Sequence, residues 1–486
     1  MNVDYHAILP AVILAMTVVV VLVVDAFLPR RHAWVGMPLG LLGVVASLVA
    51  VLTLIGQDRS TFGGHYVVDE FTVVFQAFFL IVAIVVLAVS LRYIREGGFY
   101  QGEFYFLLLT AFLGCVLMPA SRDLLMLFVS LELVSAPGFL MSAFRKSDPK
   151  GNEGGIKFFI IGVLSTAVML YGMSMIVGLT GATRLDAVAQ GLAGLSGAKV
   201  TLADASILFV VVGFAFKVSA VPFQFWAPDT YEGSPVPVAA FLAVASKTAG
   251  FAGLLQLMFV AFVGQAAFWA PMFAAIAIVT MTLGNLVALQ QTQVVRLLAY
   301  SGIAQAGYLL LPFALVGPDA GVNAAAFSAT VSYLLIYAVM NLGAFAVVTA
   351  VSRRHPRVLI EDFNGLTKAA PLLGIGMAVC MVSLAGVPPT GGFWAKLLIF
   401  QAAIDRGGIG VALAVVMLVN SVVSISYYFA VPRAMIFRDA ATDEPLRPSV
   451  LVSGVVALAV IALLLIFILP NAFAHLGDIA TLATGG

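Results

Sequence analysis

Long apolar runs recur along the whole sequence and are separated by short polar segments. Each run holds about 20 residues, the length that a helix needs to cross roughly 30 Å of hydrocarbon. Hydrophobic residues make up 62% of the chain and charged residues only 10%, and no stretch has the composition of a water-soluble domain. The sequence therefore predicts an all-α integral membrane protein. Its net charge of +1 leaves no basic patch for a nucleic acid.

The apolar runs predict about fourteen transmembrane helices. The first run has no positively charged segment before it and no cleavage site after it, so we expect a membrane helix and not a removed signal. The longest runs exceed a straight crossing and must tilt, break or extend into water. The predicted ranges are 8–28, 35–56, 71–91, 103–120, 122–144, 154–180, 203–225, 235–262, 267–290, 294–316, 321–350, 371–403, 408–437 and 449–470.

Positive charges are divided unevenly between the two sets of connecting segments. The segments after odd-numbered helices hold fifteen, namely Arg30, Arg31, Arg92, Arg95, Arg145, Lys146, Lys150, Arg296, Arg353, Arg354, Arg357, Lys368, Arg433, Arg438 and Arg447. The segments after even-numbered helices hold only five, namely Arg59, Arg122, Arg184, Lys199 and Arg406. The positive-inside rule places the larger set in the cytoplasm. With an even number of crossings, we expect both termini on the opposite side, periplasmic or external.

The stretch 213–248 carries two lysines inside apolar runs, Lys217 and Lys247. A charge in the hydrocarbon layer is costly and usually faces a partner or a water-filled path. Lys396 also lies deep in an apolar run, and Glu132 is the only acid in the middle of a predicted helix. These four residues are the candidate functional groups.

The remaining polar residues suggest no redox centre. Cys115 and Cys380 fall inside apolar runs and are expected to be small buried hydrophobes. The five histidines lie in loops or at helix ends, which predicts no histidine metal site. The sequence contains no CxxC, no histidine pair within a helix and no GxGxxG at a strand–helix turn. We therefore expect no cofactor and no metal in this chain.

Two short segments resemble each other, VSAVPFQFW at 218–226 and SLAGVPPTGGFW at 383–394. Pro222 then corresponds to Pro388, and the same separation along the chain carries the predicted fourth helix onto the ninth. Because five helices is an odd number, the pattern predicts inverted repeats. Proline removes a backbone donor and clashes with the preceding turn, so we expect helix breaks at Pro222 and at Pro388 and Pro389. Such breaks mark ion or substrate paths in transporters.

The repeat divides the chain into four predicted parts. Residues 1–102 form an N-terminal three-helix segment, and residues 103–262 form the first five-helix repeat. Residues 263–437 form the second, inverted five-helix repeat, and residues 438–486 form a C-terminal helix. Each repeat is expected to contain one broken helix.

The run FKVSAVPFQFWAPDTYEGSPVPVAAFLAVASKTAGF at 216–251 resembles the signature of the antiporter-like membrane subunits of respiratory complex I. Further matches are SLELVS around Glu132, RLLAYSGIAQAGYLL at 296–310 and GVPPTGGFWAKLLIF at 386–400. The APDTYEGSP turn is closer to the N subunits of bacterial NADH:quinone oxidoreductases than to the L or M subunits. The resemblance covers nearly the full chain, and no lateral helix is predicted after the fourteenth, which is similar to the N and M subunits.

The resemblance implies a role for each candidate residue. Glu132 and Lys217 match the carboxylate–lysine pair of the family, and Lys247 matches its central lysine. Lys396 matches the exit-side lysine, where the M subunits carry a glutamate. Lys157 matches a lysine of the sixth helix in N subunits.

Elementary proton chemistry agrees with these roles. Burial lowers the pKa of a lysine and a nearby carboxylate raises it, so a lysine under both influences can change its protonation near neutral pH. Movement of Glu132 relative to Lys217 would switch that lysine. We hypothesise that the proton then passes through water to Lys247 and on to Lys396. Polar neighbours able to hold water on this path are Ser219, Gln224, Ser246, Thr248, Ser301, Gln305 and Tyr308.

Most of these residues also have a structural explanation. Lys157 stands near a helix end and can be an interfacial anchor. Glu132 and Lys217 can be a buried pair that only fixes helix packing. Lys396 can extend from a broken helix to the interface, and the prolines can be simple kinks. Lys247 lies about a dozen residues into its helix, where a structural explanation is weakest.

The function predicted from the sequence is a proton-translocating membrane subunit, a translocase component of NADH:quinone oxidoreductase. The resemblance implies that other subunits of the complex bind NAD, FMN, iron–sulfur clusters and quinone. Its partners would be other membrane subunits of complex I and the lipid bilayer, with no nucleic acid. The alternative is a component of a multisubunit cation/proton antiporter, and a third interpretation is a purely structural membrane spacer.

Overall fold

The computed structural model describes residues 3–28, 34–439, 446–480 and 482, and the side chains of 472 and 474 are not described. Arg30, Arg31 and His32 lie outside the described residues. The membrane helices are α1 (Tyr5–Phe27), α2 (Gly36–Leu52), α3 (Glu70–Glu96), α4 (Gln101–Leu117), α5 (Leu124–Ser142), α6 (Pro149–Thr180), α8 (Ala198–Val218), α10 (Val236–Phe241) with α11 (Lys247–Gln256), α12 (Ala266–Ala288), α13 (Val294–Leu310), α14 (Ala320–Ser352), α16 (Pro371–Ala385), α17 (Gly391–Arg406), α18 (Ile409–Phe437) and α19 (Val450–Ile468).

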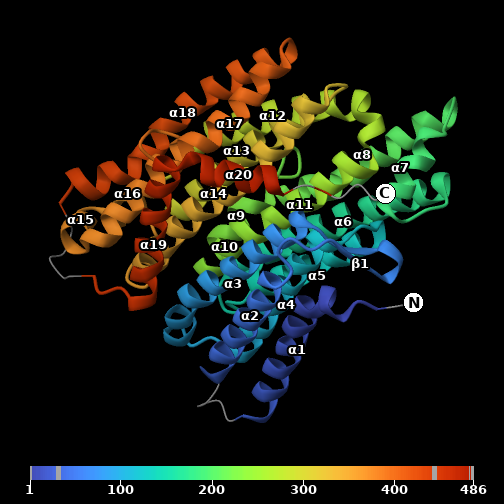
Figure 1. Cartoon of the computed structure of the whole chain (residues 1–486). Helices are drawn as coiled ribbons and strands as arrows, with labels where there is room; N and C mark the ends of the chain where they lie inside the picture. Colours follow the sequence, from blue (N-terminus) through green and yellow to red (C-terminus); the bar gives the residue numbers. More distant parts are fainter. Residues whose placement is uncertain (1–2, 29–33, 440–445, 481, 483–486) are drawn as a thin grey trace.

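The all-α membrane architecture is confirmed. Twelve helical segments in the described part of the chain are long and apolar enough to cross a membrane, and α2 and α16 are shorter apolar helices in two further predicted crossings. The count of fourteen therefore stays a prediction. The chain passes from α1 and α2 at one end of the molecule to α18 at the other, with α9, α10 and α14 between them (Figure 1).

Five short elements, two strands and three helices, were not predicted from the sequence. A hairpin pairs β1 (Arg59–Thr61) with β2 (Tyr66–Val68) in antiparallel register. The others are helices α7 (Leu185–Ala193), α15 (Leu366–Ala369) and α20 (Pro470–Ile479). All of them lie outside the 20-residue apolar runs, so a search for membrane crossings passes over them.

The segment that carries Lys247 is the most enclosed part of the fold. The segment Val236–Ala261 is buried along the whole apolar window, whereas α1, α18 and α19 expose most of theirs. Two π-helical turns, Leu242–Ser246 and Leu257–Ala261, interrupt this segment on either side of α11. Such turns are rare and often occur at functional sites, and Lys247 follows directly after the first.

The predicted break in the seventh helix is present and falls earlier than expected. The predicted range 203–225 is wrong at its end, because α8 stops at Val218 and Ser219 has a left-handed backbone with φ of 60°. Pro222 cannot donate to the preceding turn, so the helix does not resume at once. Most of the APDTYEGSP segment forms the short helix α9 (Trp226–Gly233), where the sequence predicted a turn.

The second predicted break lies between α16 and α17. Helix α16 ends at Ala385, and Gly386 then adopts a left-handed backbone with φ of 81°. Glycine takes this conformation without a Cβ penalty, so the helix can end sharply there. Ser219 and Gly386 are one position farther apart along the chain than Pro222 and Pro388. Each break contains one cis peptide bond, Val221–Pro222 and Pro388–Pro389.

Contacts between connecting segments join members of the same predicted set. Arg353 pairs with Glu96, and Gln293 bridges to Leu359, all in segments beside odd-numbered crossings. In the other set, Arg59 pairs with Asp4 at 2.8 Å, and Ser328 in the first turns of α14 donates to Asp478 at 2.6 Å.

Candidate functional site

Lys217 is buried in the last turn of α8, beside the first break. Its Nζ donates to Ser135 Oγ on α5 at 2.9 Å. Glu132, one helical turn earlier on α5, interacts with Lys217 electrostatically but forms no ion pair with it within 4.0 Å among the described residues. One carboxylate oxygen of Glu132, Oε1, is buried without a hydrogen-bond partner in the described structure. The two residues of the predicted pair are thus neighbours, and Ser135, which the sequence analysis missed, holds the lysine.

The stem of Lys217 packs against α11 at Gly250. A Cβ atom at position 250 would lie 3.1 Å from Lys217 Cγ, so a glycine is needed for the close approach. Gly250 is one helical turn after Lys247 on α11. This contact brings the end of α8 to the helical turn that carries the central lysine.

Lys247 is buried and donates from Nζ to the carbonyl oxygen of Gly302 on α13 at 2.6 Å. A Cβ atom at Gly302 would lie 3.1 Å from this Nζ and 3.2 Å from the hydroxyl of Tyr337. Glycine at this position therefore keeps space for both the ammonium and the hydroxyl. The Tyr337 hydroxyl on α14 is buried and has no hydrogen-bond partner within the described part of the chain.

A series of hydrogen bonds continues from the Gly302 turn toward the second break. Ser301 Oγ and the Tyr428 hydroxyl are 2.6 Å apart. Gln305 donates from Nε2 to the Tyr428 hydroxyl at 3.0 Å and to the carbonyl of Leu384 at 3.1 Å. The next carbonyl, that of Ala385, accepts from Lys396 Nζ at 2.8 Å. Two predicted path residues, Ser301 and Gln305, thus lie between Lys247 and Lys396.

Lys396 on α17 folds back over the end of α16. The last carbonyls of a helix have no partner within it, and a cation there also stabilises the negative end of the helix dipole. By binding the carbonyl of Ala385, Lys396 supplies a hydrogen-bond donor and a positive charge at the end of α16. Its Nζ also lies 4.9 Å from the centre of the Tyr308 ring. A Cβ atom at Gly386 would lie 2.6 Å from Lys396 Cδ. The glycine that ends α16 therefore also admits the lysine stem.

A cluster of polar side chains on α12, α13 and α18 surrounds the Tyr308 hydroxyl. Asn285 donates from Nδ2 to this hydroxyl at 2.9 Å and to Asn420 Oδ1 at 3.1 Å. The Tyr427 hydroxyl donates to Asn285 Oδ1 at 2.9 Å. Of this group, only Tyr308 was predicted from the sequence. Asparagines and tyrosines in apolar runs form no sequence pattern that shows which of them meet across helices.

Three other predicted path residues have buried oxygens without a hydrogen-bond partner in the described structure. They are Ser219 Oγ, Gln224 Oε1 and Thr248 Oγ1. Ser246 is buried within the first π-helical turn. Buried polar atoms that lack a protein partner are usually satisfied by water. These residues flank Lys217 and Lys247 along the chain but are not part of the hydrogen-bond series toward Lys396.

Lys157 lies apart from the buried lysines. Its side chain is 41% exposed and its Nζ pairs with Asp229 and with Glu153, each at 2.6 Å. Asp229 on α9 also binds Arg296 at 2.7 Å. Partial burial disfavours the charged carboxyl, but the bonds to Lys157 and Arg296 outweigh it and lower the pKa of Asp229. This position fits the structural explanation of Lys157 as an anchor.

The acidic residues of the APDTYEGSP segment on α9 therefore form ion pairs with basic residues of neighbouring helices. Glu232 binds Arg296 at 2.8 Å and Lys150 at 2.6 Å. Burial again opposes ionisation, and these two partners nevertheless lower the pKa of Glu232. The ion-pair network links α9 to the start of α6 and to α13 and fixes the segment that follows the first break.

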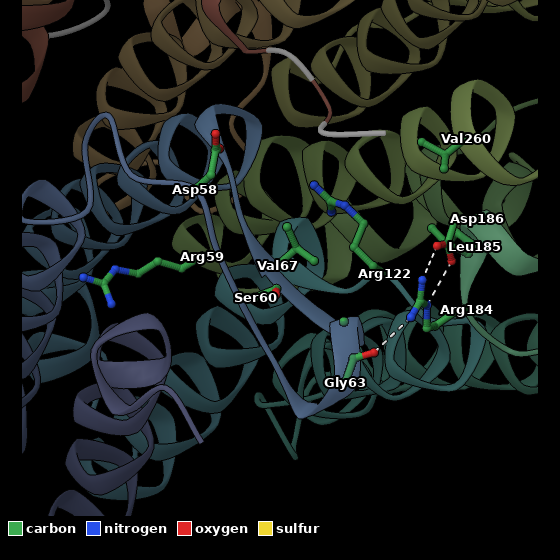
Figure 2. Close-up of a pocket in the computed structure, with 11 residues that line it drawn as sticks. Asp58, Arg59, Ser60, Gly63, Val67, Arg122, Arg184, Leu185, Asp186 and Val260 are labelled. Atoms are coloured by element: carbon green, nitrogen blue, oxygen red, sulfur yellow. Dashed lines mark hydrogen bonds and ion pairs between the residues drawn. The ribbon is translucent and has the colours of Figure 1, made fainter. Parts of the chain in front are cut away.

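A polar cavity of about 440 Å³ lies on the other side of the molecule and contains none of the predicted site residues (Figure 2). Figure 2 shows Arg184 between Asp186 and the carbonyl of Gly63, to which it donates at 3.1 Å. The Arg184 guanidinium holds the pKa of Asp186 below its usual range. Arg122, also at this cavity, is buried and pairs with Asp69 at 2.6 Å. The Arg184 bond ties the turn of the β1–β2 hairpin to the start of α7, and the Arg122 pair ties the segment before α5 to the start of α3.

Within the described ranges, no group of three or more histidine, cysteine, aspartate or glutamate side chains could hold a metal ion. Cys115 and Cys380 are buried free thiols, as expected from their apolar surroundings. Cys115 Sγ lies 3.9 Å from the carbonyl of Ala245 in the first π-helical turn. The buried polar groups described above are ammonium, hydroxyl, amide and carboxyl groups.

The fold and these contacts define a multi-pass membrane protein with three buried lysines arranged along a polar interior. The family described as "NADH:quinone oxidoreductase/Mrp antiporter, TM" matches residues 121–424, which is more than half of the chain. The protein belongs to this family.

Close relatives cover almost the whole chain. The chain is 39% identical over 496 residues to the NADH-quinone oxidoreductase subunit N 2 of Symbiobacterium thermophilum, covering 97% of this chain and 96% of the relative. It is 41% identical to the NAD(P)H-quinone oxidoreductase subunit 2 of Synechococcus elongatus, over 89% and 81% of the two chains. A chain in the structure of respiratory complex I from Thermus thermophilus with bound aureothin superposes with a TM-score of 0.80 at 33% identity, covering 98% of this chain and 100% of that chain.

Proposed function

We propose that this protein is a proton-translocating membrane subunit of a respiratory NADH:quinone oxidoreductase, similar to the N subunits. Relatives with that name align along nearly its full length. The observation that carries the proposal is that Lys247 binds the carbonyl of Gly302 and that hydrogen bonds run from the neighbouring Ser301 through Tyr428 and Gln305 to the end of α16, where Lys396 binds. Intramembrane ionisable groups of this kind mark ion and proton paths.

The bond from Tyr333 fixes the orientation of the Gln305 amide in this series. The Tyr333 hydroxyl donates to the Gln305 carbonyl oxygen, which turns the amide nitrogen of Gln305 toward Tyr428. Tyr428 accepts that bond, and in the bond between Tyr428 and Ser301 either hydroxyl can be the donor. Hydroxyl groups donate and accept, so Ser301 and Tyr428 can relay a proton, while Gln305 orients them.

The lysines at the two ends of this series hold the proton in transit. Lys247 and Lys396 each donate to a backbone carbonyl, an acceptor that cannot take a proton from them. The proton therefore leaves each lysine only through a polar side chain or water. Water bound at Thr248 Oγ1 and the Tyr337 hydroxyl completes the path around Lys247.

Glu132 and Lys217 form the input of the path in this proposal. Lys217 is held by a serine hydroxyl and not by the carboxylate, although the two charges interact. A shift of Glu132 toward Lys217 would stabilise the protonated lysine, and a shift away would release its proton toward α11.

The energy for translocation comes from quinone reduction elsewhere in the complex. We assign NAD and quinone, which the names of the relatives mention, to other subunits, together with the FMN and iron–sulfur clusters that the family resemblance implies. The partners of this chain are other membrane subunits and the bilayer. The fifteen-to-five division of positive charges supports a bacterial inner membrane location with both termini in the periplasm.

The test replaces Lys247 by alanine in the assembled complex and measures protons moved per quinone reduced in sealed native vesicles. We expect the ratio to fall, because the central relay is removed. Lys199→Ala is the matched control, since Lys199 is an exposed lysine at the start of α8. A full ratio with normal quinone reduction in Lys247→Ala would refute the relay.

The same preparation separates the proposal from the antiporter alternative, which the family description also covers. We expect the tagged chain to copurify with quinone-reducing activity. Recovery with sodium-dependent proton exchange and no quinone reduction would favour the cation/proton antiporter instead.

A further inference from the structure

A cationic cavity of about 410 Å³ lies where α3 and α14 end and the segment before α19 returns. None of the residues of the proposed proton path lines it. Among the described residues its lining contains four arginines and a single acid, and the full set is Arg92, Glu96, Ala350, Arg353, Arg354, Leu446 and Arg447. The excess of guanidinium groups favours an anion in this cavity.

The single carboxylate is already engaged by two of these arginines. Arg92 Nε binds Glu96 Oε1 at 2.5 Å, and Arg353 binds the other oxygen of Glu96. Arg353 Nε is nevertheless buried without a hydrogen-bond partner in the described structure. Arginine presents a planar set of donors that matches phosphate oxygens. Arg353 therefore keeps a buried donor that Glu96 does not use.

An apolar groove of about 600 Å³ runs along the same three helices. Residues within 73–85 on α3, 335–343 on α14 and 455–466 on α19 form its main walls. Glu70 at the start of α3 is the only charged residue of the lining in the described part of the chain. An apolar groove of this length suits a hydrocarbon chain.

The cavity and the groove follow each other along all three helices. Seven residues separate Arg92 from Val85 on α3, and seven separate Ala350 from Gly343 on α14. At about 1.5 Å per residue this is roughly 10 Å. At α19 the order along the chain is reversed, and the cavity residue Arg447 comes before the groove residue Val455. A phospholipid presents an anionic group and a hydrocarbon chain at a separation of this size.

The charge pattern places the cavity at the level of lipid headgroups. All four arginines belong to the larger set of positive connecting segments, which is predicted to face the cytoplasm. Basic pockets between membrane helices on that side bind anionic lipid headgroups. We propose that the phosphate of an anionic phospholipid binds in the arginine cavity and that one acyl chain lies in the groove between α3, α14 and α19.

This lipid would support the helix that carries two tyrosines of the interior. Leu335 and Val339 of α14 line the groove, while Tyr333 and Tyr337 on the same helix point to Gln305 and to the surroundings of Lys247. Bound lipid would therefore support α14 on the side of the helix that faces away from the proposed proton path. It would also join the N-terminal segment to α14 and to the C-terminal helix.

The test counts phospholipids retained by the detergent-purified complex, using mass spectrometry of the intact complex with phosphatidylglycerol or phosphatidylcholine added back. We expect the wild type to retain one more phosphatidylglycerol than the double variant Arg92→Gln, Arg447→Gln. Arg95→Gln, an exposed arginine one turn along α3 that does not line the cavity, should retain the wild-type number.

A second variant separates a lipid from a free anion. Val339→Trp fills the groove and leaves every arginine in place, so it should lose the same phosphatidylglycerol. Equal retention by the double variant and the wild type would overturn the proposal, as would equal retention of phosphatidylcholine. Retention by Val339→Trp, or displacement of the lipid by millimolar inorganic phosphate, would show a simple anion site and overturn the acyl-chain assignment.

Discussion

The two helix breaks have the same outline and hold their lysines differently. At the first break, Lys217 precedes the end of α8 and binds the side chain of Ser135 on another helix. At the second, Lys396 follows the break and binds back to the last carbonyl of α16. A serine hydroxyl can rotate and exchange partners, whereas a helix-end carbonyl is fixed. The first break is therefore suited to switching, and the second to holding a proton at one place.

Equivalent positions in the two breaks also carry opposite charges. Along the chain, Lys396 follows Asp229 by the same separation as Gly386 follows Ser219. Asp229 lies in the ion-pair network with Lys157 and Arg296, while Lys396 is buried beside Tyr308. The helix that follows the first break, α9, thus serves as an anchor, whereas the helix that follows the second break, α17, carries a buried cation.

The largest effect is expected from exchanging the residues that end α8 and α16. Gly386→Ser places a Cβ atom 2.6 Å from Lys396 Cδ and puts a side chain in a left-handed conformation, which costs about 1–2 kcal/mol. Lys396 should leave Ala385, and protons moved per quinone reduced should drop strongly. Ser219→Gly, the reverse change, relieves the left-handed turn of its side chain and should lower the ratio less. Equal losses in both variants would mean that the breaks work alike.

A smaller effect is expected from Ser135→Ala at the first break. Loss of the hydroxyl leaves the buried Lys217 ammonium without its acceptor, at a cost of about 1–3 kcal/mol. We expect slower proton translocation, with the lysine redirected toward Glu132. Ser135→Thr keeps an acceptor and should restore the rate. Unchanged translocation in Ser135→Ala would show that the serine does not hold the lysine during turnover.

Tyr428→Phe tests the connection between Lys247 and the second break. The variant keeps the ring and removes only the hydroxyl between Ser301 and Gln305, worth about 1 kcal/mol or roughly a fivefold change in rate. The neighbouring Tyr427→Phe alters the Asn285 cluster instead and should have the smaller effect. A larger loss in Tyr427→Phe, measured as the initial rate of vesicle acidification, would place the path on the other cluster.

The smallest effect is expected from Asp229→Asn, because partly exposed ion pairs contribute less than about 1 kcal/mol. The pKa of Asp229 is lowered in the folded protein, so its stabilising effect is present at neutral pH and is lost as the pH falls through the folded value. Thermal unfolding of the wild type and the variant should therefore differ at pH 7 and converge in acid. A difference that grows in acid would contradict the network.

Much of the fold follows from the sequence because apolar length and proline chemistry are local. The apolar runs predict the membrane helices, and Pro222 and Pro388 predict the two breaks. The end of α8 at Val218 was not predictable to the residue, since the left-handed turn at Ser219 depends on packing and not on a glycine. The short elements β1, β2 and α7 lie in polar connecting segments with no repeating pattern long enough to detect.

Site residues that carry a charge within an apolar run could be predicted from the sequence. Their hydrogen-bond partners could not, because these are neutral side chains or backbone carbonyls. Lys217, Lys247 and Lys396 are conspicuous because a buried charge is costly. Their acceptors, a serine and the carbonyls of Gly302 and Ala385, are common groups without any signature. Tyr428 is likewise one of many tyrosines, and only the folded arrangement brings it between Ser301 and Gln305.

The central claim is that Lys247 and Lys396 serve one proton path. The most direct measurement is the number of protons moved per quinone reduced by complexes carrying Lys247→Ala, Lys396→Ala and both changes together. If the two lysines act in series, either replacement interrupts the same path. The double variant should then have the same lowered ratio as either single variant. A double variant whose loss is the sum of the two single losses, or an unchanged ratio in any of the three, would contradict it.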